Sequence, residues 1–415
     1  MLRWIKSSLA ILLTLVILPV IPALAQTNAD CLHYGEHSNG AKYCITMPPS
    51  LPYDTWNGDL VIFAHGYVAV DEPIDIPWSQ MTFSDGNGGV ITLPFLVNSM
   101  GYAFATTSYS ENGLAVQQGI LDILDLIDVF EGYYGTPNNI FLVGASEGGL
   151  VTTLAIERYP EAFTGGLATC GPIGNFRGQV DYWGDFRVVF DYFMDTPDLN
   201  VLPGNAMSIP SSLMNKWDTV YVPRIGGVLA ANPLNTQQLL SVTGAPVDPF
   251  NPNTIGETTL GILWYNVFAT DDAIKKLGGK PYDNRDRVYT GSLDDDALNA
   301  GVKRYKARQS ALNEIATNYE TSGMLTRPLV TMHTTGDPIV PYWHQILYSK
   351  KVPAEIFGIL YLPIEIPRYG HCNFTLPEIV NGFGSLVVMS TSQSLSMPTF
   401  LQEAGVKAEA YQLAP

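Results

Sequence analysis

The chain is poor in basic residues. Lys and Arg total 22 against 39 Asp and Glu in 415 residues, which gives a formal net charge of −17. A surface this negative repels phosphate backbones, so we expect no nucleic-acid partner. No glycine-rich phosphate loop precedes a helix at the required spacing, so no nucleotide is implied, and we expect no cofactor at all. Internal repeats and low-complexity tracts are also missing, which excludes a solenoid or a fibrous chain.

Long apolar runs are rare as well. Leu9 to Ile21 is apolar, follows Arg3 and Lys6, and ends before a small-x-small site at Ala23-Leu24-Ala25. This pattern is typical of a secretory signal peptide covering residues 1–25. A retained membrane anchor is the alternative, but the run is short and contains proline. No later segment is apolar for long enough to cross a membrane, so we expect a secreted or periplasmic chain without a membrane span.

Cysteine is scarce, with four residues in the chain. Export exposes them to an oxidising compartment, where pairing is expected and free thiols are the alternative. Three pairings are possible. Cys31 with Cys44 is the local choice, and Cys170 with Cys372 would then be a long-range pair.

Apolar runs of strand type alternate with helical patterns along most of the chain, which predicts an α/β fold with a mostly parallel sheet flanked by helices. The run at 60–64 is continuously apolar, as in a strand buried on both faces. Expected strands lie at 60–64, 102–107, 140–143, 164–169, 329–333 and 357–363. Expected helices lie at 114–130, 147–158, 342–350 and from 376 onward.

The alternation stops between about 171 and 322. This stretch is rich in aromatics and has one clear helix start near Ser292, where Ser292 and Asp295 have capping-box-like spacing. Asp294-Asp295-Asp296 is explained by the dipole of that helix, and we expect no metal site. We therefore predict a core in two pieces, 26–172 and 323–415, interrupted by an insertion at 173–322.

Gly144-Ala145-Ser146-Glu147-Gly148 lies between an expected strand and an expected helix. A serine nucleophile must stand on a sharp, strained turn, and small residues two positions away on either side let strand and helix approach closely. The helix N-terminus behind it stabilises negative charge. A chance turn is the alternative, but the strand-to-helix context favours a nucleophile at Ser146.

A nucleophilic serine needs a base, and the base needs an orienting acid. Of the six His, only His371 follows the last expected strand in a loop. Asp337, in a loop after the preceding strand, is the expected acid, although an Asp before Pro is also a common turn residue. The order Ser146, Asp337, His371, each beyond a strand end, is that of α/β hydrolases.

An oxyanion hole needs two backbone donors. We expect the N–H of Glu147, directly after the nucleophile, and the N–H of Tyr67 in the loop after the strand at 60–64. Gly66 would allow that loop to approach closely.

These residues resemble those of the α/β-hydrolase superfamily, over about 60–170 and 326–386 but not over the insertion. The resemblance implies a serine esterase with a cap or lid inserted after the sixth strand. His371-Cys372 is also similar to the His-Cys half of the motif in tannases and fungal feruloyl esterases, where that cysteine pairs with one beside the nucleophile. Ala145 occupies that position here, so we take Cys170 as the replacement partner, which would tie the His371 loop to the sheet.

The expected reaction is hydrolysis of a small-molecule or polymeric carboxylic ester through an acyl-enzyme. The insertion starts directly after a core strand, so its first aromatics should lie nearest the nucleophile and accommodate an apolar or aryl acyl group. These substrate-binding candidates are Phe176, Tyr182, Trp183 and Phe186. A serine peptidase of the same fold and a catalytically inactive binding protein are the alternatives. The sequence does not predict the oligomeric state.

Overall fold

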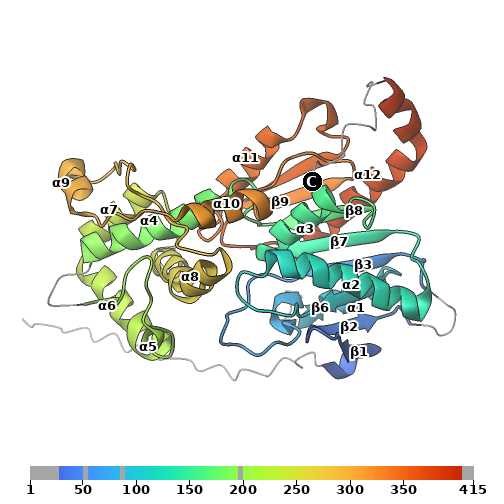
Figure 1. Cartoon of the computed structure of the whole chain (residues 1–415), viewed down its shortest axis with the longest axis horizontal. Helices are drawn as coiled ribbons and strands as arrows, with labels where there is room; N and C mark the ends of the chain where they lie inside the picture. Colours follow the sequence, from blue (N-terminus) through green and yellow to red (C-terminus); the bar gives the residue numbers. More distant parts are fainter. Residues whose placement is uncertain (1–27, 50–54, 85–88, 195–199, 404–415) are drawn as a thin grey trace, which may run out of the picture.

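The computed structural model describes residues 28–49, 55–84, 89–194 and 200–403 (Figure 1). The predicted signal peptide, residues 1–25, lies outside the described residues. Figure 1 shows two parts side by side, an open sheet with its flanking helices and a helical part next to it.

Eight strands form the main sheet, in the order β1-β2-β6-β3-β7-β8-β9-β10. β1 pairs antiparallel with β2, and β2 with β6, whereas the remaining neighbours in that order run parallel. The strands are β1 (His33–Glu36), β2 (Lys42–Thr46), β3 (Leu60–Ala64), β6 (Ala103–Thr107), β7 (Ile140–Ala145), β8 (Gly165–Thr169), β9 (Leu329–Gly336) and β10 (Tyr361–Tyr369). β4 (Thr82–Ser84) and β5 (Val90–Thr92) form a separate antiparallel pair. The predicted mostly parallel α/β sheet is confirmed.

Strand β3 is buried on both faces, as its continuous apolar run predicts. Leu60 and Ile62 pack into one core cluster, while Val61 and Phe63 pack into another on the opposite face. Because successive side chains of a strand point to opposite faces, a strand between two helical layers needs apolar residues at every position.

Helices cover both faces of this sheet. α2 (Val116–Tyr134), α3 (Glu147–Arg158) and α11 (Trp343–Lys351) contribute to the first core cluster. α1 (Leu93–Ser99) and α12 (Leu376–Glu403) contribute to the second. Short helices η1 (Asn28–Asp30), η2 (Trp78–Met81) and η4 (Ala354–Ile356) lie in connecting segments. In the described ranges, none of the helices is both long and apolar enough to cross a bilayer.

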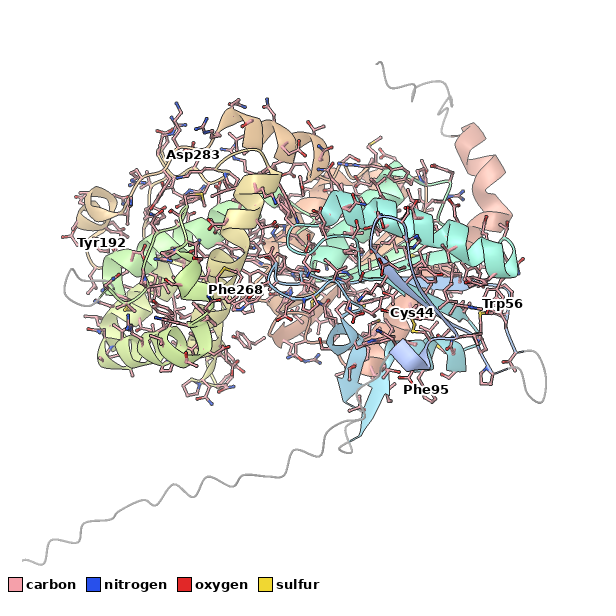
Figure 2. All side chains as sticks on the ribbon, turned by 60° about the horizontal axis from the view of Figure 1, so that its bottom comes forward. Cys44, Trp56, Phe95, Tyr192, Phe268 and Asp283 are labelled. Carbon is pink, nitrogen blue, oxygen red and sulfur yellow. A yellow bond between two sulfur atoms is a disulfide. The ribbon has the colours of Figure 1, made fainter. Side chains whose placement is uncertain are left out.

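A helical segment joins β8, the sixth main-sheet strand in chain order, to β9. It contains α4 (Phe176–Met194), α5 (Ser211–Met214), η3 (Trp217–Tyr221), α6 (Val222–Ala231), α7 (Pro233–Thr243), α8 (Thr254–Lys276), α9 (Asp295–Gly301) and α10 (Gln309–Asn318). Most of its buried residues form a core cluster of their own. In Figure 2 the labelled Tyr192, Phe268 and Asp283 lie in this segment, apart from Cys44 and Trp56 in the sheet part.

Two expected elements begin elsewhere. The strand expected at 357–363 is β10, which starts at Tyr361 and runs to Tyr369. Phe357 is 46% exposed and makes only an isolated bridge to Tyr361. The helix expected to be capped by Ser292 starts at Asp295 and is capped by Asp294, which accepts the N–H of Ala297 at 2.9 Å. Ser292 instead donates its hydroxyl to Asp295 at 2.6 Å.

Candidate active site

Ser146 stands on a sharp turn between β7 and α3. β7 ends at Ala145 and α3 begins at Glu147, so the serine is the one residue that joins them. Its φ of 59° and ψ of −123° are a conformation that residues with a side chain rarely adopt. Strain of this kind is typical of a functional residue held exposed above the end of a sheet.

Two glycines allow this turn. A Cβ at Gly144 would collide with the carbonyl oxygen of Gly148, and a Cβ at Gly148 would collide with that of Ala64 at the end of β3. Any larger residue would push α3 away from the sheet. The small residues two positions before and after Ser146 therefore have the role expected from the sequence.

Asp337 and His371 lie beside this serine. The Ser146 hydroxyl donates to His371 Nε2 at 2.8 Å, and the Nδ1–H of the same ring donates to Asp337 Oδ2 at 2.7 Å. Ser146 follows β7, Asp337 follows β9 and His371 follows β10, so all three come from the C-terminal edge of parallel strands. The structure thus brings the three predicted residues into one chain of hydrogen bonds.

Asp337 is fully buried and held on both carboxylate oxygens. Oδ1 accepts the backbone N–H groups of Ile339 and Val340 at 2.9 and 3.0 Å, which leaves Oδ2 facing His371. Hydrogen bonds to a charged acceptor are strong and directional. The carboxylate therefore has one orientation, and it fixes the proton of the imidazole on Nδ1.

Helix α4 holds the loop after β9 from the other side. Three of its side chains donate to two carbonyl oxygens of that loop: Tyr182 to Pro338 at 2.8 Å, and Gln179 and Trp183 to Ile339 at 2.9 and 3.1 Å. The position of Asp337 therefore depends on the helical segment as well as on the sheet.

Both pairs of cysteines form disulfides. Cys31–Cys44 joins the start of the β1 hairpin to β2, and Cys170–Cys372 joins the end of β8 to the residue after His371. β8 is the neighbour of β7, which carries Ser146 at its end. The second disulfide therefore ties the His371 loop to the part of the sheet that carries the serine.

The loop after β3 packs directly against the serine. A Cβ on Gly66 would lie 3.1 Å from both Ser146 Cβ and the Ala145 carbonyl oxygen, so a side chain there would force the loop outward. Gln80 clamps this loop, because its Oε1 accepts the Gly66 N–H at 2.6 Å and its Nε2 donates to the Tyr67 carbonyl at 3.2 Å. Gln80 lies in the short helix η2 and belongs to no motif, so the sequence alone does not indicate its role.

The two expected oxyanion donors remain available. In the part of the chain that the structure describes, the backbone N–H groups of Tyr67 and Glu147 have no protein acceptor. Both residues line a cavity together with Ser146, and Glu147 opens helix α3. An N–H at a helix start is well placed to stabilise negative charge.

This cavity lies between Ser146 and the helical segment. The space between its walls, part of it open to solvent, is about 790 Å³, and the walls are mostly apolar. Of the four residues predicted to bind substrate, Phe176 and Trp183 line it. Tyr182 and Phe186 do not line it: both are buried in the core cluster of the helical segment, and the Tyr182 hydroxyl reaches the Pro338 carbonyl instead. Position in the chain alone does not separate the four, because the helical period turns neighbouring residues to different faces.

Glu147 places a carboxyl group in the cavity wall. The residue is 9% exposed, and its Oε1 accepts the backbone N–H of Ala115 at 2.7 Å. Burial raises the pKa of Glu147 to about 8, against the opposing effects of the Ala115 hydrogen bond and of Lys276. The carboxyl is therefore mostly protonated at neutral pH, and it adds little charge to the cavity.

Tyr265 of α8 brings a second hydroxyl to the serine. It lines the cavity, and its hydroxyl interacts with that of Ser146. Burial, with the nearby Asp337 and Glu147, raises the pKa of Tyr265, so the hydroxyl keeps its proton. Nothing in the sequence distinguishes Tyr265 from the other aromatics of the insertion, because no motif places α8 against the serine.

Two other histidines are close but serve the structure. His333 is buried in β9 and donates from Nε2 to the Val340 carbonyl at 2.7 Å. His344 is buried in α11, where Nδ1 accepts the Gly174 N–H at 3.1 Å. Burial lowers the pKa of both rings. Both rings bond to backbone groups rather than to Ser146, although His333 Nε2 also lies 3.7 Å from Asp337 Oδ2.

Comparisons with known proteins find similarity at the level of structure. No protein-family model matches this chain, and no curated protein matches it. Est1E from Butyrivibrio proteoclasticus is 13% identical, with 86% of this chain and 96% of that chain covered and a TM-score of 0.34. A proline iminopeptidase from Mycobacterium smegmatis is 9% identical, with 85% and 96% covered and a TM-score of 0.41.

An acylaminoacyl peptidase from Pyrococcus horikoshii is 12% identical, with 81% of this chain covered and a TM-score of 0.39. The chain spans only 36% of the length of the acylaminoacyl peptidases that it matches. Identities and TM-scores this low assign no activity to the chain. Its own sheet order, its strand–serine–helix turn and the placement of Ser146, Asp337 and His371 after β7, β9 and β10 identify the fold as that of an α/β hydrolase.

Proposed function

We propose that this protein is an exported serine hydrolase that cleaves carboxylic esters through an acyl-enzyme. The observation that carries the proposal is the pair of hydrogen bonds from Ser146 Oγ to His371 Nε2 at 2.8 Å and from His371 Nδ1 to Asp337 Oδ2 at 2.7 Å. An alcohol in this setting becomes a nucleophile, because the imidazole takes its proton as the new bond forms.

The reaction has two halves. Ser146 Oγ attacks the ester carbonyl while His371 accepts the hydroxyl proton, and the N–H groups of Tyr67 and Glu147 stabilise the oxyanion. The bond to the leaving alcohol then breaks, and His371 returns the proton to that alcohol. Water attacks the acyl-enzyme by the same route and releases the acid. Asp337 keeps the tautomer and steadies the imidazolium throughout.

The helical segment, residues 173–322, is proposed to act as a cap. Helices α4 and α8 supply much of the cavity wall beside Ser146. An enclosed apolar cavity next to a nucleophile favours an apolar or aryl acyl group, from either a small or a polymeric ester. The alcohol portion would leave toward the open side.

A serine peptidase of the same fold is the second candidate, because Glu147 places a carboxyl in the cavity wall where the amine of a peptide could pair with it. Its raised pKa of about 8 leaves that carboxyl mostly uncharged at neutral pH. The cavity therefore favours an uncharged group, and the ester takes precedence.

Export is supported by two disulfides, which persist in oxidising compartments. The apolar segment before residue 26 is the proposed signal. The final location, secreted or periplasmic, depends on the cell envelope.

The test combines labelling with a substrate panel. The parent protein should be labelled by a fluorophosphonate probe and should hydrolyse p-nitrophenyl esters faster than aminoacyl p-nitroanilides. Ser146→Ala should abolish labelling and lower kcat by about 10⁶-fold. Ser99→Ala removes a hydroxyl from α1 that only bonds the Leu96 carbonyl, and it should leave both unchanged. Hydrolysis of amides alone would favour the peptidase, and a folded parent without labelling or turnover would favour an inactive binding protein.

A further inference from the structure

Tyr265 is held firmly in the wall of the cavity that Tyr67 and Glu147 also line. Its ring stacks on Trp183 with centroids 4.8 Å apart and planes 13° apart. It also meets the Tyr67 ring edge-on at 5.7 Å, and Tyr67 carries one of the expected oxyanion donors. Tyr67 is in turn anchored to α8, because its hydroxyl donates to the Phe268 carbonyl at 3.0 Å. Helix α8 is thus docked on the loop that faces the nucleophile.

The hydroxyl of Tyr265 differs from those of its neighbours. The hydroxyls of Tyr67 and Tyr182 both donate hydrogen bonds to backbone carbonyls, so these two residues have a structural role. Among the described residues, the Tyr265 hydroxyl has no backbone carbonyl as a partner; it interacts with the Ser146 hydroxyl and feels the charges of the nearby Asp337 and Glu147. The cavity that it faces is otherwise mostly apolar. A donor in such a place is free to bind an oxygen of whatever reacts at the serine.

We propose that Tyr265 is a catalytic residue supplied by the helical segment, whose hydroxyl donates to Ser146 Oγ at rest and to the oxyanion of the tetrahedral intermediate. The inference rests on the acyl-transfer function proposed above. It adds a side-chain donor to the two backbone donors of Tyr67 and Glu147.

The chemistry explains why the hydrogen bond would move. As the bond from Oγ to the carbonyl carbon forms, the Oγ proton passes to His371 Nε2 and the carbonyl π electrons move onto oxygen. Oγ becomes an ester-type oxygen and a poorer acceptor, while the carbonyl oxygen on the same carbon becomes an anion. Tyr265 keeps its own proton and gives its hydrogen bond to that anion. When the bond to the leaving alcohol breaks, His371 donates its proton to the alcohol, and Tyr265 ends unchanged.

The test is Tyr265→Phe, which removes one oxygen and keeps the ring that stacks on Trp183. Loss of an oxyanion donor typically costs about 10²–10³ in kcat, so we expect a fall of about 10²-fold with KM within about threefold of the parent. Affinity for an alkyl boronic acid, which forms a tetrahedral adduct on the serine, should fall by a similar factor. A residue that only supports the fold would lower the melting temperature without this parallel loss.

Tyr305→Phe is the matched control, because Tyr305 belongs to the same helical segment, does not line the cavity, and has a hydroxyl that interacts with the backbone of Ala206 rather than with a group at the serine. It should leave kcat and boronate affinity unchanged. A Tyr265→Phe protein with unchanged kcat, with a change in KM alone, or with unchanged boronate affinity overturns the proposal. If the parent protein itself is unreactive, the proposed function fails too. If the parent is active and only the Tyr265→Phe result is negative, the role of Tyr265 alone is overturned.

A second variant covers the case in which Tyr265→Phe does not fold. 3-Fluorotyrosine at position 265 keeps the ring and the hydroxyl but ionises at lower pH. A donor role predicts normal kcat at neutral pH and an alkaline loss of kcat that begins at lower pH than in the parent. An alkaline limb identical to that of the parent overturns the proposal.

Discussion

The sheet and the helical segment build the candidate site in different ways. The three residues of the proposed Ser-Asp-His chain come from the ends of parallel strands, where the backbone fixes their places: Ser146 after β7, Asp337 after β9 and His371 after β10. The helical segment instead supplies the cavity wall, the grip of α4 on the loop after β9 and the hydroxyl of Tyr265. The strand order thus places the reacting groups, and the packing of the helical segment determines which substrates fit beside them.

The two parts also differ in how much a substitution should cost. A change at a strand end acts on the transition state itself, whereas a change in the cavity wall acts on which acyl group fits. Effects on rate should therefore be largest in the sheet part. Apart from Tyr265, substitutions in the helical part should mainly change selectivity, and modestly.

After Ser146→Ala, Asp337→Asn should have the largest effect on kcat. The Asn oxygen can still accept the N–H groups of Ile339 and Val340, so the loop should keep its shape. Its amide NH₂ would then face His371 Nδ1 and force the ring proton onto Nε2, where it blocks proton transfer from Ser146. A wrong tautomer of this kind costs about 10⁴ in kcat, measurable with a p-nitrophenyl ester.

The matched control is Asp294→Asn in the helical segment. Asp294 caps α9, and Asn is an equally good N-cap, so kcat and melting temperature should stay near those of the parent. Equal losses in the two variants, or a fully active Asp337→Asn protein, would contradict the division between the two parts.

Glu147 lies where the two parts meet, and it should make stability depend on pH. Its pKa is raised by burial from 4.5 to about 8 in the folded protein. The folded state therefore binds the proton more tightly than the unfolded chain does. The stability that this gives is fully present below about pH 4.5 and is lost as pH rises toward 8, by up to about 4 kcal/mol.

Glu147→Gln should remove this dependence, because the amide oxygen can still accept the Ala115 N–H and no proton is bound. Urea unfolding at pH 5, 7 and 9 should show a steeper loss for the parent than for the variant. The exposed Glu161→Gln serves as the control and should keep the slope of the parent. Parallel curves for parent and Glu147→Gln would show that this carboxyl is not buried as described.

The sheet part was largely predictable from sequence. β3, β7 and α3 agree closely with their expected ranges, because a strand buried on both faces needs a continuous apolar run and a helix on the sheet needs a clear period. β10 was misplaced for the opposite reason. It is the edge strand, its positions are only partly buried, and it contains Pro363 and Pro367, so no apolar run marks it.

The helical part was much less predictable. Its helices pack against one another, so aromatics occur on several faces and the period that identifies an amphipathic helix is blurred. Tyr265 reaches the serine, and Gln80 reaches the loop packed against it, only through the tertiary fold, from 119 and 66 positions away from Ser146 in the chain. A sequence motif consists of residues that are close along the chain, and neither Tyr265 nor Gln80 shares a motif with Ser146.

Ala269→Leu should give the smallest effect, and it tests directly whether the helical segment selects the acyl group. Ala269 lies in α8 and lines the cavity beside Ser146, so a larger side chain would fill space proposed for the acyl group. We expect kcat/KM for a p-nitrophenyl decanoate or aryl ester to fall about tenfold, while that for the acetate changes by less than about threefold. The reason is that a short acyl group should stay near Tyr265 and not extend the further helical turn to Ala269.

Ala231→Leu, at the exposed end of α6, adds the same atoms away from the cavity and should alter no ratio between esters. An equal loss on every ester in Ala269→Leu would mean that the substitution disturbs the fold rather than the acyl site. Unchanged selectivity with full activity would mean that the acyl chain runs elsewhere, and the helical segment would then cover the serine without choosing its substrate.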